Sequence, residues 1–289
     1  RIIFFNSISG VAEFTAHIIL FFLQYSKKLK FLCSPTTGHN HIDLKYLNDK
    51  NIELVSLRGE REFLNTIRAT PEHTFGLILS LIRNYKAAFI HVGLGRWDRD
   101  SLKGSELYGK NVGIIGMGRV GMLIAQYCRL FGSKISYFDI NKVSVESDFF
   151  SKDSVGSLIE SADIVVLCAS YDKGMGFILD KEEVKLLKGK FLINTARGEL
   201  INEKYLIHAI EEGGVSGVAL DVISNEEDCE RVKKWSKLSE KYSNLIVTPH
   251  IAGATVESME RTEVFIVEKL INFLKNITKI CLDFNLIIC

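Results

Sequence analysis

The chain has 289 residues, 47% of them hydrophobic and 25% charged, with only three prolines. This composition is typical of a globular protein with one large core or two ordinary ones, and it excludes a disordered or fibrous chain. The net charge of +1 gives no broad field for attracting nucleic acid or an anionic membrane, so we expect a small-molecule partner.

The first elements in chain order are largely apolar. Residues 15–25, "TAHIILFFLQY", form the most apolar stretch near the start, but about 20 residues are needed to span a bilayer. No small-residue cleavage site follows, so this pattern predicts a core helix rather than a signal peptide. The runs 30–33 and 52–56 predict short buried strands, with a helix over 41–50 between them.

A long amphipathic helix is predicted over residues 69–89. Thr70 is its expected N-cap, Pro71 takes the first helical position, and apolar residues recur at spacings of three and four. We expect this helix to begin one domain and to pack against the other.

Strands and helices alternate from residue 111 onward. Several of the strands are almost continuously apolar, which indicates burial on both faces, as in a parallel sheet with helices on each side. The predicted strands are 112–116, 134–139, 163–170, 190–196, 217–222 and 244–250, and the predicted helices are 119–132, 154–162, 202–214 and 256–277. The expected fold class is therefore α/β, with a doubly wound parallel sheet.

The stretch "VGIIGMGRVG", residues 112–121, places three glycines directly after an apolar strand and at the start of a helix. This is the dinucleotide-binding fingerprint in the context that it requires. We expect Gly116 to make the tight turn, Gly118 to let the backbone approach a pyrophosphate, and Gly121 to let the helix lie against the strand. The N–H groups and partial positive charge of the helix N-terminus suit the phosphates.

Asp139 ends the next predicted strand, 23 residues after Gly116. The acid that binds the ribose hydroxyls is expected about 20 residues after the first glycine. Because a carboxylate there repels the 2′-phosphate of NADP, NAD is the expected cofactor. The alternative is a structural glycine turn with a helix-capping aspartate, but both signals occur in one β–α–β unit, which favours dinucleotide binding.

Charged or titratable residues follow the later strands, at the edge where open α/β sheets bind ligands: Arg197, Asp221, Glu226 and His250. An arginine fork can hold a carboxylate with two parallel hydrogen bonds, and a nearby carboxylate keeps a histidine protonated. Together they predict hydride transfer between a nicotinamide and a 2-oxo acid. Arg197 would anchor the carboxylate and polarise the carbonyl, and His250, supported by Glu226, would exchange the proton. Each residue alone also fits a structural role, such as a surface ion pair or a turn cap, but their joint occurrence at successive strand ends favours catalysis.

The segments "GKNVGIIGMGRVG", "INTARGELINE", "GVALDVISNEE" and "IVTPHIAGAT" resemble, in order and spacing, the motifs of the D-isomer-specific 2-hydroxyacid dehydrogenases. This family includes phosphoglycerate, glycerate, formate and D-lactate dehydrogenases, and the resemblance covers roughly residues 30–275. It implies a Rossmann-type NAD-binding domain over residues 71–262 and a smaller flavodoxin-like substrate domain made of residues 1–70 and 263–289, with a cleft between them. The family usually dimerises through the NAD-binding domain, so we expect a homodimer.

The resemblance also implies the site residues. The catalytic set would be Arg197, Glu226 and His250, and the loop "SPTTGHNHID" would bind the substrate carboxylate with backbone N–H groups. The implied substrate-binding residues are Thr36, Thr37, Gly38, Arg197 and His250. The implied NAD contacts are Gly116, Gly118, Arg119, Val120, Gly121, Asp139, Ala169, Thr195, Ala196, Arg197, Asp221, His250 and Gly253. No metal is implied.

The chain departs from the family pattern at several positions. The departures are Thr36 in place of a common glycine, Ser170 and Glu227 in place of prolines, and Met175 in place of a threonine. The change at Glu227 leaves open whether Glu226 or Glu227 faces His250, and the spacing from Asp221 favours Glu226.

The start of the chain and its cysteines add two expectations. The chain begins with Arg1 and is short by about one strand–helix unit before residue 30, so we expect a substrate domain truncated at its N-terminus. The six cysteines form no CxxC pair and no Cys/His metal spacing, which favours free thiols and a cytoplasmic location.

Two rival functions and the substrate stay open. A non-catalytic NAD-binding protein of the same fold would act through association with a partner, and another Rossmann enzyme, acting on an amine or a sugar, would not need a 2-oxo acid. Arg58 and Arg61 are candidates for binding a substrate phosphate, as in phosphoglycerate, or are solvated loop charges.

Overall fold

A computed structural model describes residues 2–4, 29–39 and 42–283, with side chains for 29–39 and 42–275. The chain divides into two compact units: Arg1–Ile67 together with Gly253–Cys289, and Arg68–Ala252. These boundaries lie three and ten residues before the predicted domain boundaries, because the helix after residue 67 belongs wholly to the second unit and the last helix wholly to the first. The helix predicted over residues 15–25 lies outside the described residues.

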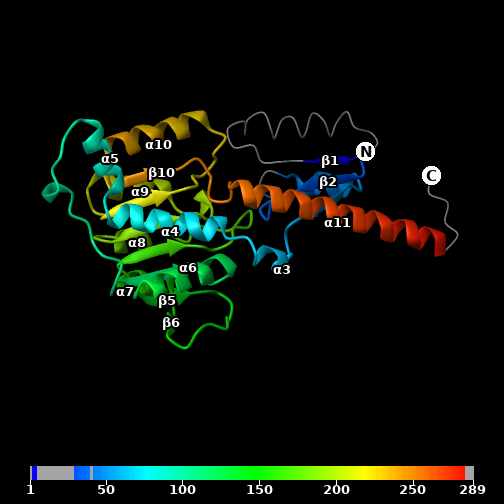
Figure 1. The fold of residues 1–289 in the computed structure, drawn as a ribbon, viewed down its shortest axis with the longest axis horizontal. Helices are drawn as coiled ribbons and strands as arrows, with labels where there is room; N and C mark the ends of the chain where they lie inside the picture. The colour runs from blue at the N-terminus through cyan, green and yellow to red at the C-terminus, as the bar shows by residue number, and fades with distance from the viewer. Residues whose placement is uncertain (1, 5–28, 40–41, 284–289) are drawn as a thin grey trace. The chain divides into compact units, whose positions relative to one another are not determined.

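The second unit contains a seven-stranded sheet in the order β10-β9-β8-β7-β4-β5-β6 (Figure 1), and every pairing in it is parallel. This confirms the predicted doubly wound α/β fold. The strands are β4 (Asn111–Ile115), β5 (Lys134–Phe138), β6 (Phe149–Ser151), β7 (Ile164–Leu167), β8 (Phe191–Asn194), β9 (Gly217–Leu220) and β10 (Leu245–Val247).

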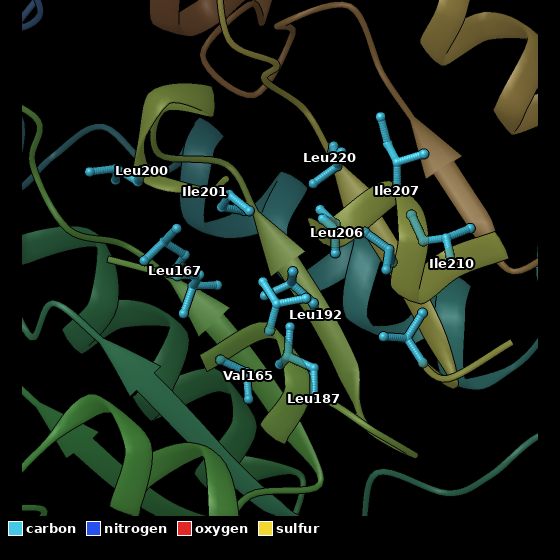
Figure 2. Close-up of a cluster of buried hydrophobic side chains, with 14 of the residues drawn as sticks. Val165, Leu167, Leu187, Leu192, Leu200, Ile201, Leu206, Ile207, Ile210 and Leu220 are labelled. Carbon is cyan, nitrogen blue, oxygen red and sulfur yellow. The ribbon is translucent and has the colours of Figure 1, made fainter. Parts of the chain in front are cut away.

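Helices cover both faces of this sheet, so alternate strand residues enter two separate cores. In β7, Val165 and Leu167 join one core, whereas Ile164 and Val166 join the other. Figure 2 shows the first core, where α9 side chains gather with those of the strands. The helices are α4 (Ala69–Ile82), α5 (Tyr85–Gly93), α6 (Arg119–Leu130), α7 (Val155–Ser161), α8 (Lys181–Leu186), α9 (Glu203–Glu211) and α10 (Cys229–Lys241), with short 3₁₀ turns η1 (Asp100–Leu102) and η2 (Gly198–Leu200).

The first unit contains a three-stranded parallel sheet among the described residues, in the order β1-β2-β3. Cys33 and Val55 of this sheet pack against Ile266 and Leu270 of the last helix. The elements are β1 (Ile2–Phe4), β2 (Phe31–Ser34), α2 (Leu44–Asp49), β3 (Glu53–Ser56), α3 (Arg61–Leu64) and α11 (Val256–Asp283). In the described part of the chain no helix is both long and apolar enough to cross a membrane.

The prediction of one helix over 69–89 was wrong in two respects. Helix α4 begins at Ala69 with Arg68 as its N-cap, so Thr70 lies inside the helix, where its carbonyl accepts the Thr74 hydroxyl at 2.7 Å. The helix ends after Ile82, and Asn84 takes a left-handed conformation (φ +55°) before α5 begins. Asparagine tolerates this conformation better than most residues, which explains a break that apolar spacing does not reveal.

Candidate active site

The predicted site residues of the second unit follow the carboxyl ends of strands that belong to one parallel sheet. Glycines 116 and 118 follow β4, Asp139 follows β5, Arg197 follows β8, and His250 follows β10. Because all strands run parallel, their carboxyl ends share one edge. The strand order also reverses between β4 and β7, the point at which doubly wound sheets bind ligands.

His250 and Glu226 form a hydrogen-bonded ion pair at this edge. Nδ1 of His250 lies 2.7 Å from Oε2 of Glu226, which settles the choice between Glu226 and Glu227. This hydrogen bond raises the pKa of His250 above its ordinary value, assisted by the charges of Glu226 and Asp221 and opposed by burial and by the charge of Arg197. Because Nδ1 is engaged, Nε2 is the ring nitrogen that can exchange a proton with a ligand.

The backbone of His250 is held in a left-handed conformation with φ +53°, which is rare for a non-glycine residue. The buried carboxylate of Asp221 fixes this turn, since it accepts backbone N–H groups of Ile251 and Ala252, each at 2.9 Å. It also accepts the hydroxyl of Thr248 at 2.6 Å. A backbone conformation that is rare and is held by three hydrogen bonds to one carboxylate indicates a functional role for this turn.

Asp221 also contacts His73 of α4, whose Nε2 lies 3.3 Å from Oδ1. Burial opposes ionisation of Asp221, but hydrogen bonds from His73, Thr248 and two backbone N–H groups lower its pKa. Asp221 was predicted to contact NAD. In the structure its side chain holds the His250 turn, and the contact with NAD stays a prediction.

The turn that carries Arg197 is fixed by Asn194, the last residue of β8. The Asn194 side chain donates to the carbonyl of Arg197 and accepts the N–H of Ala196, both at 2.9 Å. The hydroxyl of Thr195 pairs with that of Thr74 at 2.7 Å. Arg197 itself donates from Nη1 to the carbonyl of Ala196 at 2.6 Å, which uses one of the five N–H groups of its guanidinium.

The glycine turn fits a dinucleotide. A Cβ on Gly116 (φ +93°) would lie 2.6 Å from the backbone nitrogen of Ala169, and a Cβ on Gly121 would overlap the carbonyl oxygen of Gly116. A Cβ on Gly118, by contrast, would meet no atom of the described chain within 4 Å. Gly118 is exposed and directly precedes α6, so the backbone N–H groups at the start of this helix are open to a phosphate.

Two further features beside this turn suit NAD. Asp139 accepts the N–H of Met117 at 2.8 Å, so its carboxylate lies next to the glycine turn, where the ribose acid is expected. Arg119, the first residue of α6, has its pKa lowered by burial and by the positive charge of Arg68. Two arginines close together at a helix N-terminus favour an anionic ligand there.

The remaining predicted residues belong to the first unit. Thr36 donates its hydroxyl to the carbonyl of Gly38 at 2.9 Å and lies 2.8 Å from the hydroxyl of Ser34, so the loop has its own internal order. Thr37 is exposed and Gly38 half-buried. Gly253 is the first residue of the C-terminal part of this unit.

A family model described as "D-isomer specific 2-hydroxyacid dehydrogenase, NAD binding domain" matches residues 75–252. The chain belongs to the D-isomer-specific 2-hydroxyacid dehydrogenases. The match spans every predicted site residue of the second unit, from Gly116 to His250, and none of those in the first unit. This agrees with the resemblance that the motifs indicate.

Named members of this family are similar to the chain over most of its length. The D-3-phosphoglycerate dehydrogenase of Bacillus subtilis is 38% identical over 257 residues, 86% of this chain and 46% of that protein. The glyoxylate reductase of Thermofilum pendens is 32% identical over 264 residues, 88% of this chain and 74% of that protein. The chain thus spans about half the length of the Bacillus subtilis relative.

A solved member of the family has the same fold. The structure of D-lactate dehydrogenase from Aquifex aeolicus, complexed with NAD and lactic acid, superposes with a TM-score of 0.77 at 28% identity. The superposition covers 95% of this chain and 83% of that one. The chain therefore carries the NAD-binding domain of the family in its second unit.

The sequence analysis missed the residues that hold the candidate catalytic side chains in place. Asn194, Thr74 and His73 act through hydrogen bonds to neighbours as far as 175 residues away in the chain. The sequence did contain one indication of the role of Asn194, which is a polar residue at the end of an otherwise apolar strand. A buried side-chain amide needs hydrogen-bond partners, and nearby backbone groups supply them.

Proposed function

We propose that the protein is an NAD-dependent oxidoreductase that interconverts a D-2-hydroxy acid and the corresponding 2-oxo acid. The observation that carries this proposal is the His250–Glu226 pair at 2.7 Å, with Arg197 close enough for its charge to act on His250. A proton-exchanging histidine beside an arginine fork suits a substrate with a carboxylate next to a carbonyl or hydroxyl group.

Three residues of the chain have distinct roles in the proposed reaction. Arg197 binds the substrate carboxylate and polarises the carbonyl oxygen, and His250 delivers a proton from Nε2 to that oxygen during reduction. Glu226 keeps His250 protonated, because its hydrogen bond raises the pKa of the imidazole. In the oxidative direction the neutral histidine accepts the proton from the hydroxyl group.

The glycine turn and its surroundings would hold the cofactor. The N–H groups at the start of α6 and Arg119 would bind the pyrophosphate, and Asp139 would bind the adenosine ribose. NAD bound there supplies the nicotinamide that exchanges a hydride with the substrate carbon. The backbone amides of Thr36, Thr37 and Gly38 are proposed to bind the substrate carboxylate, by the family resemblance.

The proposal is tested by measuring NADH oxidation with a panel of 2-oxo acids that includes pyruvate-like, hydroxylated and phosphorylated members. We expect turnover with at least one acid and none with simple ketones, which lack a carboxylate for Arg197. Tight NADH binding without any turnover would favour the non-catalytic rival. Preference for a phosphorylated acid would support a phosphate role for Arg58 or Arg61.

Replacing Asp139 with alanine should weaken NAD binding by about 10- to 100-fold, the effect of losing hydrogen bonds to a charged acceptor. Because the replacement also removes repulsion of a 2′-phosphate, the ratio of NADP to NAD affinity should rise. Titration of NADH and NADPH fluorescence measures both affinities.

Asp139→Asn is a useful companion variant, since it keeps an acceptor for the N–H of Met117 while losing the charge. Asp148→Ala, which removes an exposed acid paired with Arg129, is the matched control and should change neither affinity. An unchanged NAD/NADP preference in both Asp139 variants would show that another residue distinguishes the two cofactors.

We further propose that the chain forms a homodimer through α5 and the segment that follows it. Large apolar side chains are exposed along this stretch, with Phe89 72% and Trp97 91% exposed, together with Val92 and Leu94. Figure 1 shows the segment after α5 at the outer edge of its unit, away from the sheet. Clusters of exposed apolar residues of this kind mark interaction surfaces.

The double variant Phe89→Ser/Trp97→Ser should weaken dimerisation by at least about 100-fold, since burying two large apolar side chains contributes about 3–6 kcal/mol. Sedimentation velocity over a concentration series measures this change. Phe150→Ser, which alters an exposed phenylalanine on β6, serves as control and should leave the dimer intact. A monomeric parent protein, or a double variant that stays dimeric, would contradict this interface.

We also propose a reducing compartment, the cytoplasm, for this protein. Three cysteines with described side chains, Cys33, Cys128 and Cys168, are free thiols. Burial raises the pKa of Cys33 to about 11 and that of Cys128 to about 12, which makes these thiols unreactive toward disulfide exchange.

A further inference from the structure

The Glu226–His250 pair is too exposed to fix its own geometry. The side chain of Glu226 is 35% exposed and that of His250 is 45% exposed. Ion pairs at this level of exposure contribute less than the conformational entropy lost when the residues of a turn are ordered. The turn that carries Glu226 must therefore be held by other contacts.

Ser224, two residues before Glu226, is held by two charged side chains. Its backbone N–H donates to Oε1 of Glu203 at 2.7 Å, and its hydroxyl accepts Nη1 of Arg231 at 2.7 Å. Arg231 also donates from Nη1 to Oε2 of Glu203 at 2.7 Å, which closes a triangle of three groups. Glu203 begins α9 and its side chain is only 12% exposed, whereas that of Arg231 is 36% exposed, so it is the Glu203 carboxylate that is better shielded from water than either member of the Glu226–His250 pair.

A second anchor lies two residues after Glu226. The side chain of Asp228 caps α10 by accepting the N–H groups of Glu230 and Arg231. Between the anchors, Asn225 takes a left-handed conformation (φ +50°), and its carbonyl accepts the N–H of Asp228 at 3.0 Å. Glu226 therefore lies midway along a short turn that is tied down at both ends.

The same turn touches the turn that carries Arg197. A Cβ on Gly198 would overlap the backbone of Ile223 and Ser224, so the two turns are in direct backbone contact. Arg231 therefore contacts Ser224, whose backbone in turn contacts Gly198, next to Arg197.

We propose that Glu203 and Arg231 are positioning residues: by holding Ser224 they keep Glu226 against His250. Only the expected effect on catalysis rests on the proposed function, because the hydrogen bonds that hold Ser224 and Glu226 are present without a ligand. The charged groups that act on His250 are Glu226 and Asp221, which favour its protonated form, and Arg197, which disfavours it. Releasing Glu226 removes the hydrogen bond that contributes most to raising the pKa of His250.

The test is NMR titration of the His250 imidazole in the ligand-free protein. Its signal can be assigned among the seven histidines by its absence in a His250→Gln variant. In Arg231→Gln the titration midpoint should move to lower pH by at least half of the difference between the parent protein and Glu226→Gln. Reduction of the 2-oxo acid needs protonated His250, so its kcat/KM should fall about three- to tenfold above the midpoint and less below it.

Three further variants make the result decisive. Lys233→Gln removes an exposed ion pair with Glu230 on the same helix and should leave the midpoint unchanged. Ser224→Ala removes only one contact of Arg231 and should shift the midpoint in the same direction, so it replaces Arg231→Gln if that variant fails to fold. In a Glu226→Gln background, Arg231→Gln should add no further shift, because both act through the same contact.

Three results would overturn the positioning role: an unchanged midpoint in a folded Arg231→Gln protein, an equal shift in Lys233→Gln, or a full additional shift in the Glu226→Gln background. Failure of the proposed function is distinguishable, because a chain that turns over no 2-oxo acid still gives a readable titration of His250.

Discussion

Replacing His250 with alanine should lower kcat for the 2-oxo acid by about 10²–10⁴-fold, the usual contribution of a positioned general acid. The imidazole is the group at the site with a pKa raised by a hydrogen-bonded carboxylate, so it is protonated when the carbonyl oxygen needs a proton. Cofactor binding should persist, because Asp221 holds the turn through the N–H groups of Ile251 and Ala252 and not through the imidazole. Steady-state rates and NADH fluorescence titration separate the two effects.

His208→Ala is the matched control, since His208 is an exposed histidine in the last turn of α9. It should leave both the rate and NADH affinity unchanged. Should His250→Ala turn over at the parent rate, the proton would come from another group and the assignment of His250 would be wrong. Loss of NADH binding together with activity would instead indicate that the variant disturbs the turn.

The fold could be predicted because its pattern is local. Strands such as β7, with four consecutive buried residues, can be recognised from their apolar runs, and glycines 116 and 121 show where a strand turns closely into a helix. The errors arose where a single residue overrides the pattern. Asn84 adopts a left-handed conformation and ends α4, although the apolar spacing continues beyond it.

Three of the described helices, α3, α8 and α10, were not predicted from the sequence. The longest of them, α10, was missed because its first turn is strongly charged. Helix α10 begins at Cys229, inside the run "NEEDCE", which has the composition of a solvated loop. Its signals were the N-cap Asp228, which accepts two backbone N–H groups, and buried Trp235 and Leu238 spaced by three.

The site could be predicted only in part. The charged residues at strand ends can be recognised from the sequence, because parallel strands bring their carboxyl ends to one edge. Asn194 and Arg231, which hold the turns that carry these residues, cannot be recognised in this way, because they act through partners that the tertiary fold supplies. Asp221 was recognised as a strand-end residue, but its role in holding the His250 turn was not, for the same reason. A polar residue's role in such a network depends on which donors and acceptors surround it, and one sequence does not specify these.

Replacing Arg197 with glutamine should lower kcat/KM for the 2-oxo acid by about 10²–10³-fold, within the cost of removing one partner of a hydrogen-bonded charge pair. If Arg197 only bound the carboxylate, KM alone would rise; because it is also proposed to polarise the carbonyl, kcat should fall as well. Arg197→Lys keeps the charge but loses the planar fork, so it should recover only part of the loss.

The structure supports this variant and supplies a control for it. The turn around Arg197 is held by the Asn194 side chain through backbone groups of Ala196 and Arg197, so glutamine can replace arginine without releasing it. Arg129→Gln is the matched control, since it removes an exposed arginine that pairs with Glu146 and Asp148 on the surface. Values of kcat and KM within twofold of the parent in Arg197→Gln would mean that another cation binds the acid, and the 2-oxo acid assignment would lose its main chemical support.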